Sequence, residues 1–308
     1  MTKILVTGSA GLIGRPLVRQ LRRDGYEVVE LDLDHSSDEM QGDIRCSSRV
    51  ALALRGCAGV IHLAAVARVL KAASDPERCR TTNVTGTRVV VEEARRTASC
   101  GWLVFASSRE VYGQPAVLPV DENAPTQPLN LYGQSKLVGE GLVRQAERDG
   151  LAVGVARLTN TYGSVNDHLD RVVPAFALAA ATGAQLRVEG AENRLDLLHV
   201  DDAVTGLVKI ARRLASTKRS APTVQLVSGT SVSIGELARL CVSVADSDAT
   251  VETLPPRTDH VSRFVGDPAF ALELLGWAPS IPLREGVARL VAAFHASPID
   301  HAQKRSAS

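Results

Sequence analysis

Net charge is almost absent from this chain of 308 residues, which contains 35 lysines and arginines and 34 aspartates and glutamates. Such a balance gives no indication of a nucleic-acid or membrane-surface partner. Long hydrophobic runs are also absent, since no apolar stretch reaches the roughly 18 residues that a membrane-spanning helix needs. The amino terminus passes from one lysine directly into a strand-like pattern. We therefore expect a cytoplasmic protein that is not secreted.

Cysteine is scarce, and no cysteines are paired in a motif. The five cysteines are widely scattered and never arranged as CxxC: Cys46, Cys57, Cys79, Cys100 and Cys241. We therefore expect buried free thiols, with neither a disulfide framework nor a bound metal. The composition, with 45% hydrophobic and 22% charged residues, is typical of a globular protein with a full-sized core.

Short segments rich in β-branched residues recur between residue 1 and about residue 160, with helical patterns between them. They read KILVTG, YEVVELD, GVIHLAA, WLVFASS and LAVGVARL. Strands that alternate with helices form right-handed crossovers and a parallel sheet. Continuous apolar runs suit strands that are covered on both faces. The predicted fold class is therefore α/β, with a doubly wound parallel sheet of the Rossmann type.

The other expected elements are less regular. Between the second and third segments we predict a short strand that ends near Asp43, and then a helix capped by Ser47 or Ser48. Later helices are predicted at 174–182, 202–214, 234–244 and 284–295, with strands at 185–188 and 224–227. Residues 254–267 are expected to form a loop that closes over a site, and residues 297–308 a flexible tail.

A dinucleotide-binding pattern follows the first predicted strand. The run TGSAGLIG places Gly8, Gly11 and Gly14 at the start of a helical pattern, where glycines let a pyrophosphate approach the positive end of the helix. The second strand ends at Asp32, roughly the distance at which an acid binds the ribose hydroxyls. Because this carboxylate would repel the extra phosphate of NADP, we expect NAD as the cofactor. Asp34 remains an alternative for the acid.

Tyr132 and Lys136 lie four residues apart in LYGQSK. In a helix this spacing places both side chains on one face. A lysine ammonium close to a phenol stabilises the phenolate and lowers its pKa towards that of a working general base. An isolated pair of this kind would be inert more often than catalytic, so its interpretation depends on the motifs around it.

Several motifs together resemble one family. They are TGSAGLIG, Asp32, HLAA at 62–65, SSREVYG at 107–113, YGQSK at 132–136 and LHVDD at 198–202. The combination resembles the extended short-chain dehydrogenase/reductase family, and more narrowly its NAD-dependent epimerase/dehydratase group, which includes UDP-sugar 4-epimerases. The similarity covers residue 1 to about residue 294.

The resemblance implies the domain organisation and the assembly. It implies an NAD-binding domain mainly at residues 1–165, to which parts of 195–230 return, and a smaller, irregular substrate-binding lobe mainly at 166–296. It also implies a homodimer formed through residues 84–97 and the helix that carries Tyr132. The remaining expected cofactor contacts are Leu12, Ile13, Asp43, Ile44, Leu63, Ala64 and Ala65, with Asp43 and Ile44 near the adenine.

The catalytic residues that the resemblance implies are Ser108, Tyr132 and Lys136. Tyr132 matches the family's acid/base, and Lys136 matches the residue that tunes it and holds the nicotinamide ribose. Ser108, anchored on the VYG at 111–113, matches the hydroxyl that binds the reacting sugar oxygen. Ser107 takes that role if the register shifts by one residue. His62 is expected to be structural, since a histidine that ends a buried strand usually finds a backbone partner.

The implied substrate contacts are Asn160 and Arg257. Asn160 matches an asparagine that contacts the substrate near its diphosphate, and Arg257 resembles an arginine that clamps the diphosphate from the carboxyl-terminal lobe. A planar guanidinium suits phosphate oxygens. Asn83 matches an asparagine in a helix behind the site, so we expect it to be structural.

Two departures from the family pattern limit the choice of substrate. Dehydratases of this group carry an acidic pair after the serine or threonine, whereas this chain has Arg109 and then Glu110, so 4,6-dehydration is not expected. Both residues are expected substrate contacts. Family members also often have an arginine where this chain has Leu195. The adjacent Arg194 is the expected substitute, although a shift of one residue on a strand turns a side chain to the other face.

The leading hypothesis is an NAD-dependent epimerase that acts on a nucleotide sugar, at C4, in carbohydrate biosynthesis. The nicotinamide would accept a hydride and return it, without net change. One alternative is a net oxidoreductase of a sugar, an aminocyclitol or another small carbonyl compound, which the loss of the arginine at Leu195 favours. Glu110 keeps nucleotide-sugar decarboxylation open. A non-catalytic, NAD-sensing relative would not need both Tyr132 and Lys136.

Overall fold

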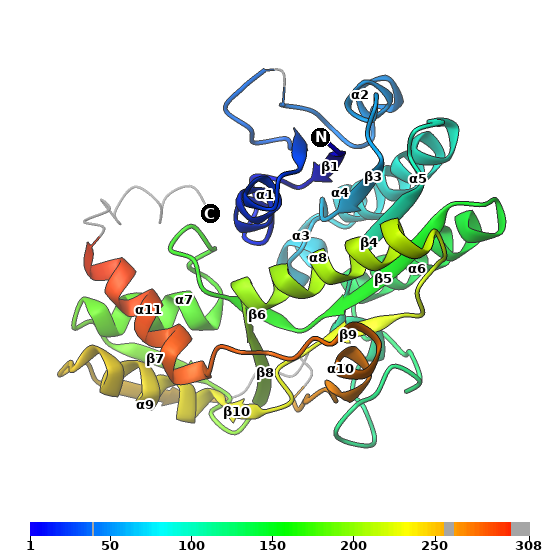
Figure 1. Ribbon diagram of the computed structural model, residues 1–308. Helices are drawn as coiled ribbons and strands as arrows, with labels where there is room; N and C mark the ends of the chain where they lie inside the picture. Colours follow the sequence, from blue (N-terminus) through cyan, green and yellow to red (C-terminus); the bar gives the residue numbers. More distant parts are fainter. Residues whose placement is uncertain (39, 256–261, 297–308) are drawn as a thin grey trace.

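A six-stranded parallel sheet forms the centre of the fold in the computed structural model, which describes residues 1–38, 40–255 and 262–296 (Figure 1). In spatial order its strands are β2 (Glu27–Leu31), β1 (Lys3–Thr7), β3 (Gly59–His62), β4 (Trp102–Ser108), β5 (Ala152–Leu158) and β9 (Val224–Leu226). Every neighbouring pair is parallel. The five amino-terminal strands and the strand at 224–227 are therefore confirmed as predicted.

Helices cover both faces of this sheet. One face carries α1 (Gly14–Arg23), α8 (Val200–Thr217) and α10 (Ala269–Leu275), and the other carries α2 (Ser47–Ala53), α5 (Thr87–Arg96) and α6 (Leu131–Arg148). Successive side chains of a strand point to opposite faces of the sheet, so Ile4 and Val6 belong to the first core and Leu5 belongs to the second. The doubly wound α/β fold is thus confirmed.

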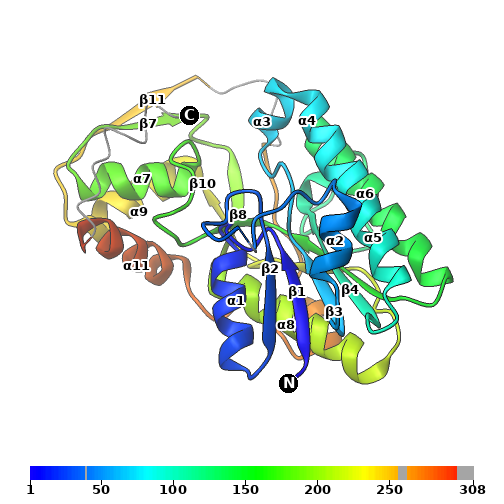
Figure 2. The ribbon, with the colours of Figure 1, turned by 90° about the horizontal axis from the view of Figure 1, so that it is seen from above.

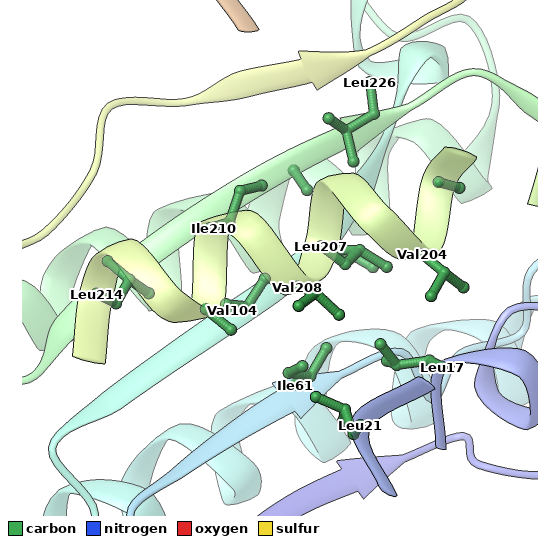
Figure 3. Close-up of a cluster of buried hydrophobic side chains, with 14 of the residues drawn as sticks. Leu17, Leu21, Ile61, Val104, Val204, Leu207, Val208, Ile210, Leu214 and Leu226 are labelled. Atoms are coloured by element: carbon green, nitrogen blue, oxygen red, sulfur yellow. The ribbon is translucent and has the colours of Figure 1, made fainter. Parts of the chain in front are cut away.

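The core beneath α8 shows how the sheet and its helices are held together. Leu207 and Val208 of α8 pack towards Ile61 of the sheet and Leu17 of α1 (Figure 3). These side chains are almost completely buried. Each fully buried aliphatic side chain contributes about 1.5–3 kcal/mol. Because α8 comes late in the chain, this packing ties residues near 205 to the amino-terminal half of the protein.

Short helical segments link β3 to α5 and follow β4. They are α3 (Val69–Ser74), α4 (Pro76–Arg80), the π-helical turn η1 (Thr81–Gly86) and the 3₁₀ turn η2 (Arg109–Tyr112). The sequence did not predict α3, α4 or η2, whereas a helix around Asn83 was expected and is provided by η1. These segments bring residues 68–86 and 109–112 close to the start of α6.

A smaller lobe follows residue 160. It contains α7 (Val172–Ala181), α9 (Ile234–Ala245) and α11 (Leu283–Ala296), which pack on one another and lie on the far side of the molecule from α5 and α6 (Figure 2). The lobe also contains two small sheets. One has three strands, β10 (Ser231–Ser233), β8 (Arg194–His199) and β6 (Asn160–Tyr162), and the other has two, β11 (Val251–Leu254) and β7 (Leu186–Glu189). The four late helices and the strand at 185–188 are confirmed.

Three expectations about local structure were wrong. The strand near Asp43 is reduced, among the described residues, to one isolated bridge between Asp32 and Gln41. Helix α2 has Cys46 at its N-cap, because the Ser47 hydroxyl donates to Glu93 (2.9 Å) instead of capping the helix. Four of the free cysteines are buried, but Cys46 is exposed.

The placement of α8 and β9 supports the expected division of the chain, which we propose as two domains with a boundary near residue 165. Both elements lie after that boundary, yet they pack on and within the six-stranded sheet. The expected tail at 297–308 and the centre of the expected loop, 256–261, lie outside the described residues. No helix in the described ranges combines the length and the apolar character needed to cross a bilayer.

Candidate active site

The glycine-rich turn between β1 and α1 packs directly against the loop that follows β3. Gly8 has a φ of +72°, and a Cβ added there would lie 2.7 Å from the backbone nitrogen of Ala64. A Cβ on Gly14 would lie 2.1 Å from the carbonyl oxygen of Gly8. Only glycine therefore fits at these two positions. The Asp32 carboxylate accepts a hydrogen bond from the backbone N–H of Ala10 (2.9 Å), which ties the end of β2 to this turn.

A cavity of about 140 Å³ opens beside the glycine-rich turn. Of the expected cofactor residues, its walls include Asp32, Ile44, Ala64 and Ala65. The other lining residues are Leu31, Leu33, Asp34, Gly42, Val66, Arg78 and Thr82. In parallel α/β sheets, ligands bind where the strand order reverses, which here is between β1 and β3.

The residues around this cavity fit NAD. The glycine turn leads into the amino-terminal end of α1, which favours a pyrophosphate, and Asp32 supplies a carboxylate for ribose hydroxyls. The Asp43 carboxylate forms an ion pair with the Arg45 guanidinium (2.6 Å), which lowers the pKa of the Asp43 carboxyl. Sequence reasoning missed Arg78 because it lies on α4, a short helix with no recognisable cofactor motif.

Two polar residues behind the cavity are fully engaged in structural contacts. The His62 ring bonds the hydroxyls of Thr7 (Nδ1, 2.7 Å) and Thr87 (Nε2, 3.0 Å), and burial lowers its pKa to about 3. Asn83 accepts from the backbone N–H of Val66 (2.7 Å) and donates to Ser135 (2.9 Å). Both arrangements agree with the structural roles expected for His62 and Asn83, although the partners of His62 are hydroxyls and not backbone groups.

The first turn of α6 carries Tyr132 to the carboxyl end of β4. The Asn130 side chain caps this helix by accepting from the backbone N–H of Gly133 (2.8 Å). The Tyr132 phenol lies within the influence of Ser108, the last residue of β4, whose side chain lowers its pKa. The Lys136 ammonium donates to the carbonyl oxygen of Ala106 (2.8 Å). Three residues predicted from two separate motifs are thus brought together.

The electrostatics of this trio differ from the sequence expectation. Burial raises the pKa of Tyr132 to about 12, and the Ser108 side chain opposes that rise. Burial also lowers the pKa of Lys136 to about 8. The Lys136 ammonium lies 5.9 Å from the centroid of the Tyr132 ring and is turned towards the Ala106 carbonyl. The expected lowering of the tyrosine pKa by lysine is therefore outweighed by burial in this structure.

Arg109 and Glu110 form a buried ion pair after Ser108 (2.6 Å). The other oxygen of Glu110 accepts from the Asn130 side chain (2.8 Å), and the Glu110 charge raises the pKa of Tyr132. The Nε and Nη1 atoms of Arg109 have no hydrogen-bond acceptor among the described residues. The carbon at the centre of its guanidinium lies 5.5 Å from the centroid of the Phe264 ring. Of the two expected contacts, Glu110 is therefore the one whose charge acts on the tyrosine.

A second cavity, of about 190 Å³, lies in the smaller lobe. Asn160 of β6 lines it, as expected for a substrate contact, and its amide donates to the carbonyl oxygen of Asp196 (3.3 Å). The other lining residues are Thr161, Tyr162, Asp167, Arg171, Val172, Val173, Pro174 and Leu197. Asp167 and Arg171 were not predicted, because they lie in a loop whose sequence carries no recognisable motif.

Arg194 does not line this second cavity. Its guanidinium bonds the Ser231 carbonyl oxygen and the Glu236 carboxylate, each at 3.1 Å. On β8, Leu195 and Leu197 share one face and Arg194 lies on the other. The substitution of Arg194 for the missing arginine is therefore not seen. Arg257 lies outside the described residues.

Metal ligands do not gather in this region. Within the described ranges, no group of three or more His, Cys, Asp or Glu side chains could hold a metal ion. The polar groups near Tyr132 are instead hydroxyl, amide, carboxylate and guanidinium groups.

Comparison with known proteins identifies the family. A sequence profile described as the NAD dependent epimerase/dehydratase family matches residues 4–224 of the chain. The chain belongs to this family. As a member of the NAD dependent epimerase/dehydratase family it is an enzyme, and NAD is its cofactor, in agreement with the glycine turn and Asp32.

Relatives within the NAD dependent epimerase/dehydratase family have different activities. The chain is 32% identical to UDP-glucuronic acid decarboxylase 1 of Danio rerio, covering 95% of this chain and 72% of the relative. It is 31% identical to UDP-glucose 4-epimerase of Mycolicibacterium smegmatis, covering 95% and 98%. The crystal structure of UDP-glucose 4-epimerase from Thermotoga maritima with UDP-glucose has a TM-score of 0.88 at 27% identity, covering 96% of this chain and 99% of that one.

Proposed function

We propose that this protein is an NAD-dependent epimerase that inverts C4 of a nucleotide sugar. The observation that carries the proposal is the convergence of Ser108, Tyr132 and Lys136 at the carboxyl end of β4. Asn160, in the adjoining lobe, lines the cavity where the substrate would bind. The similarity to two UDP-glucose 4-epimerases supports this choice of reaction.

The residues of the chain have distinct roles in this reaction. Bound NAD supplies the hydride acceptor. Tyr132 removes the proton from the sugar hydroxyl and later returns it, and the Ser108 hydroxyl orients the reacting oxygen. Burial favours the protonated phenol in the free protein, since it raises the pKa of Tyr132 to about 12. We infer that the pKa of Tyr132 falls as the site fills and Lys136 comes closer.

Two alternatives each have one supporting observation. Leu195 takes the place of an arginine on the substrate side of β8, which favours a smaller substrate and a net oxidoreductase. Glu110 lies close enough to Tyr132 to raise its pKa, and UDP-glucuronic acid decarboxylase 1 is a relative, which together favour decarboxylation. The reaction products and the net formation of NADH distinguish the epimerase, the oxidoreductase and the decarboxylase.

The test uses the purified protein with added NAD and a panel of UDP, dTDP and GDP sugars. Epimerisation predicts a C4 epimer in the proton NMR spectrum, no accumulation of NADH and no release of carbon dioxide. Tyr132→Phe should remove this activity and keep the NAD. Steady NADH formation would favour the oxidoreductase, and carbon dioxide release the decarboxylase. If no sugar nucleotide is bound or converted, the proposal fails.

We further propose a homodimer in which α5 and α6 of each subunit form the interface. These helices pack side by side on one face of the sheet, and Val138 of α6 is exposed. Sedimentation equilibrium should give twice the mass of the chain. Val138→Glu should then shift the equilibrium towards the monomer, whereas a monomeric wild-type protein would contradict the interface.

A further inference from the structure

The cavity of the smaller lobe has one positively charged residue among its described walls, Arg171. The UDP, dTDP and GDP sugars carry a diphosphate, and a buried anion needs a cation or several donors close to it. On β8 the residue that lines the cavity is the apolar Leu197, and Arg194 is engaged on the opposite face of that strand. The charge must therefore come from another part of the cavity wall.

Arg171 is only loosely engaged with its carboxylate partner. Its Nη1 lies 3.2 Å from each oxygen of Asp167, longer than the roughly 2.7–2.9 Å of a strong charge-assisted bond. Asp167 is held independently by accepting from the backbone N–H of His168 (2.8 Å). About a third of the Arg171 side chain is exposed, against 2% for Asp167. Arg171 can therefore turn to a ligand while Asp167 stays in place.

The neighbouring aspartate is already neutralised from the other domain. Asp170 forms an ion pair with Arg68, which lies in the loop after β3. This pair anchors the backbone beside Arg171 to the NAD-binding side of the molecule. It also leaves Asp167 as the remaining carboxylate that competes for Arg171 within the cavity wall.

Arg171 shares its cavity wall with Asn160, which is expected to contact the substrate. The Arg171 charge also lowers the pKa of Tyr132, although less than burial raises it. A substrate that contacts Asn160 within this cavity would therefore also meet Arg171. Arg171 is thus within reach of an anionic group on the same molecule.

We propose that Arg171 is the anion-binding residue of the substrate pocket, where its guanidinium exchanges Asp167 for a negatively charged oxygen of the substrate. The proposal rests on the function proposed above. Two parts of a sugar nucleotide offer such an oxygen, the diphosphate and, in a uronic acid, the sugar carboxylate. The carboxylate and the phosphate each present two oxygens that a guanidinium can bind through two N–H groups.

The test is isothermal titration of the NAD-loaded enzyme with UDP, UDP-glucose and UDP-glucuronic acid, for wild type and Arg171→Gln. Weakening of all three ligands by about tenfold or more assigns Arg171 to the diphosphate. Unchanged UDP binding with selective weakening of UDP-glucuronic acid assigns it to the carboxylate. Affinities within twofold for all three ligands would overturn the proposal. If the wild-type protein binds none of the three ligands, both the proposed function and the role of Arg171 are contradicted.

Two further variants separate binding from folding. Arg187→Gln removes an exposed arginine on β7 whose ion pair with Glu252 is long (3.6 Å), and should leave all three affinities unchanged. Asp167→Asn removes the competing carboxylate, and should tighten the ligand that Arg171→Gln weakens. If Asp167→Asn weakens that ligand as much as Arg171→Gln does, the pair acts only by holding the loop, and the proposal is wrong.

Discussion

Ser107 and Ser108 are adjacent on β4, but their hydroxyls make contacts on opposite sides of the strand. The Ser108 side chain acts on the Tyr132 phenol at the candidate active site, where it opposes the rise of the tyrosine pKa that burial causes. Ser107 donates to the buried Glu140 carboxylate (2.5 Å), which also pairs with Arg157 (2.8 Å). Alternation along a strand produces this separation. It favours Ser108 over Ser107 as the hydroxyl that meets the substrate.

The serine pair yields the first prediction. Ser108→Ala should lower kcat by about 10²-fold or more, since it removes a donor to the reacting oxygen. Ser107→Ala should leave kcat within a few-fold and cost about 1–3 kcal/mol of stability, because Glu140 loses a buried partner. Steady-state kinetics and urea unfolding of both variants check this. The reverse pattern would place Ser107 in the active site.

The second prediction concerns the glycine-rich turn. Gly14→Ala should abolish NAD binding, because the new methyl group would lie 2.1 Å from the Gly8 carbonyl oxygen. Gly235→Ala is the matched control, since it lies in α9, away from the proposed dimer interface, and the nearest atoms to its added Cβ are 3.4 Å away; it should change the stability by less than about 1 kcal/mol. Fluorescence titration with NADH and thermal melting measure both effects. Wild-type NADH affinity in Gly14→Ala would contradict this view of the turn.

The third prediction concerns pH and His62. Burial lowers its folded-state pKa to about 3 from an ordinary value of 6.5, so the unfolded chain takes up a proton first as the pH falls. His62 should therefore cost stability as the pH falls from 6.5 towards 3, at about 1.4 kcal/mol for each pH unit. Unfolding of wild type and His62→Gln between pH 7 and 5 should show a steeper loss for wild type, by about 2 kcal/mol in total. Parallel curves would show that His62 does not titrate in this way.

The fourth prediction concerns the buried pair Arg109–Glu110. Glu110→Gln should destabilise the ligand-free protein by about 3–5 kcal/mol, because it leaves a buried guanidinium without a counter-charge. Adding Arg109→Met should recover part of this loss. Glu77→Gln breaks an exposed pair with Arg80 and should cost about 0–1 kcal/mol. Guanidinium chloride would itself screen the pair, so urea unfolding is the measurement. A small effect of Glu110→Gln would mean that water reaches Arg109.

Most of the central sheet could be predicted because its first five strands are short runs rich in apolar residues between helical patterns, and such a local pattern is visible in the sequence without the neighbouring strands. The short strand β6, Asn160–Tyr162, carries no such pattern. It is a strand only because its backbone pairs with Leu197, Leu198 and His199 of β8. The strand expected near Asp43 is the opposite case. Its sequence pattern is extended, but among the described residues its backbone forms only one isolated bridge, between Gln41 and Asp32.

The amino-acid sequence by itself determined the parallel sheet, the glycine turn, Asp32 and the pairing of Tyr132 with Lys136, because these depend on spacing within one or two adjacent elements. Only the tertiary structure decided which serine meets Tyr132, that Arg194 turns away from the cavity, and that Arg171 lines it. Those outcomes depend on contacts between residues far apart in the chain. Burial likewise decided the sign of the Tyr132 pKa shift, because the cost of removing charge from water depends on how the whole protein packs around the phenol.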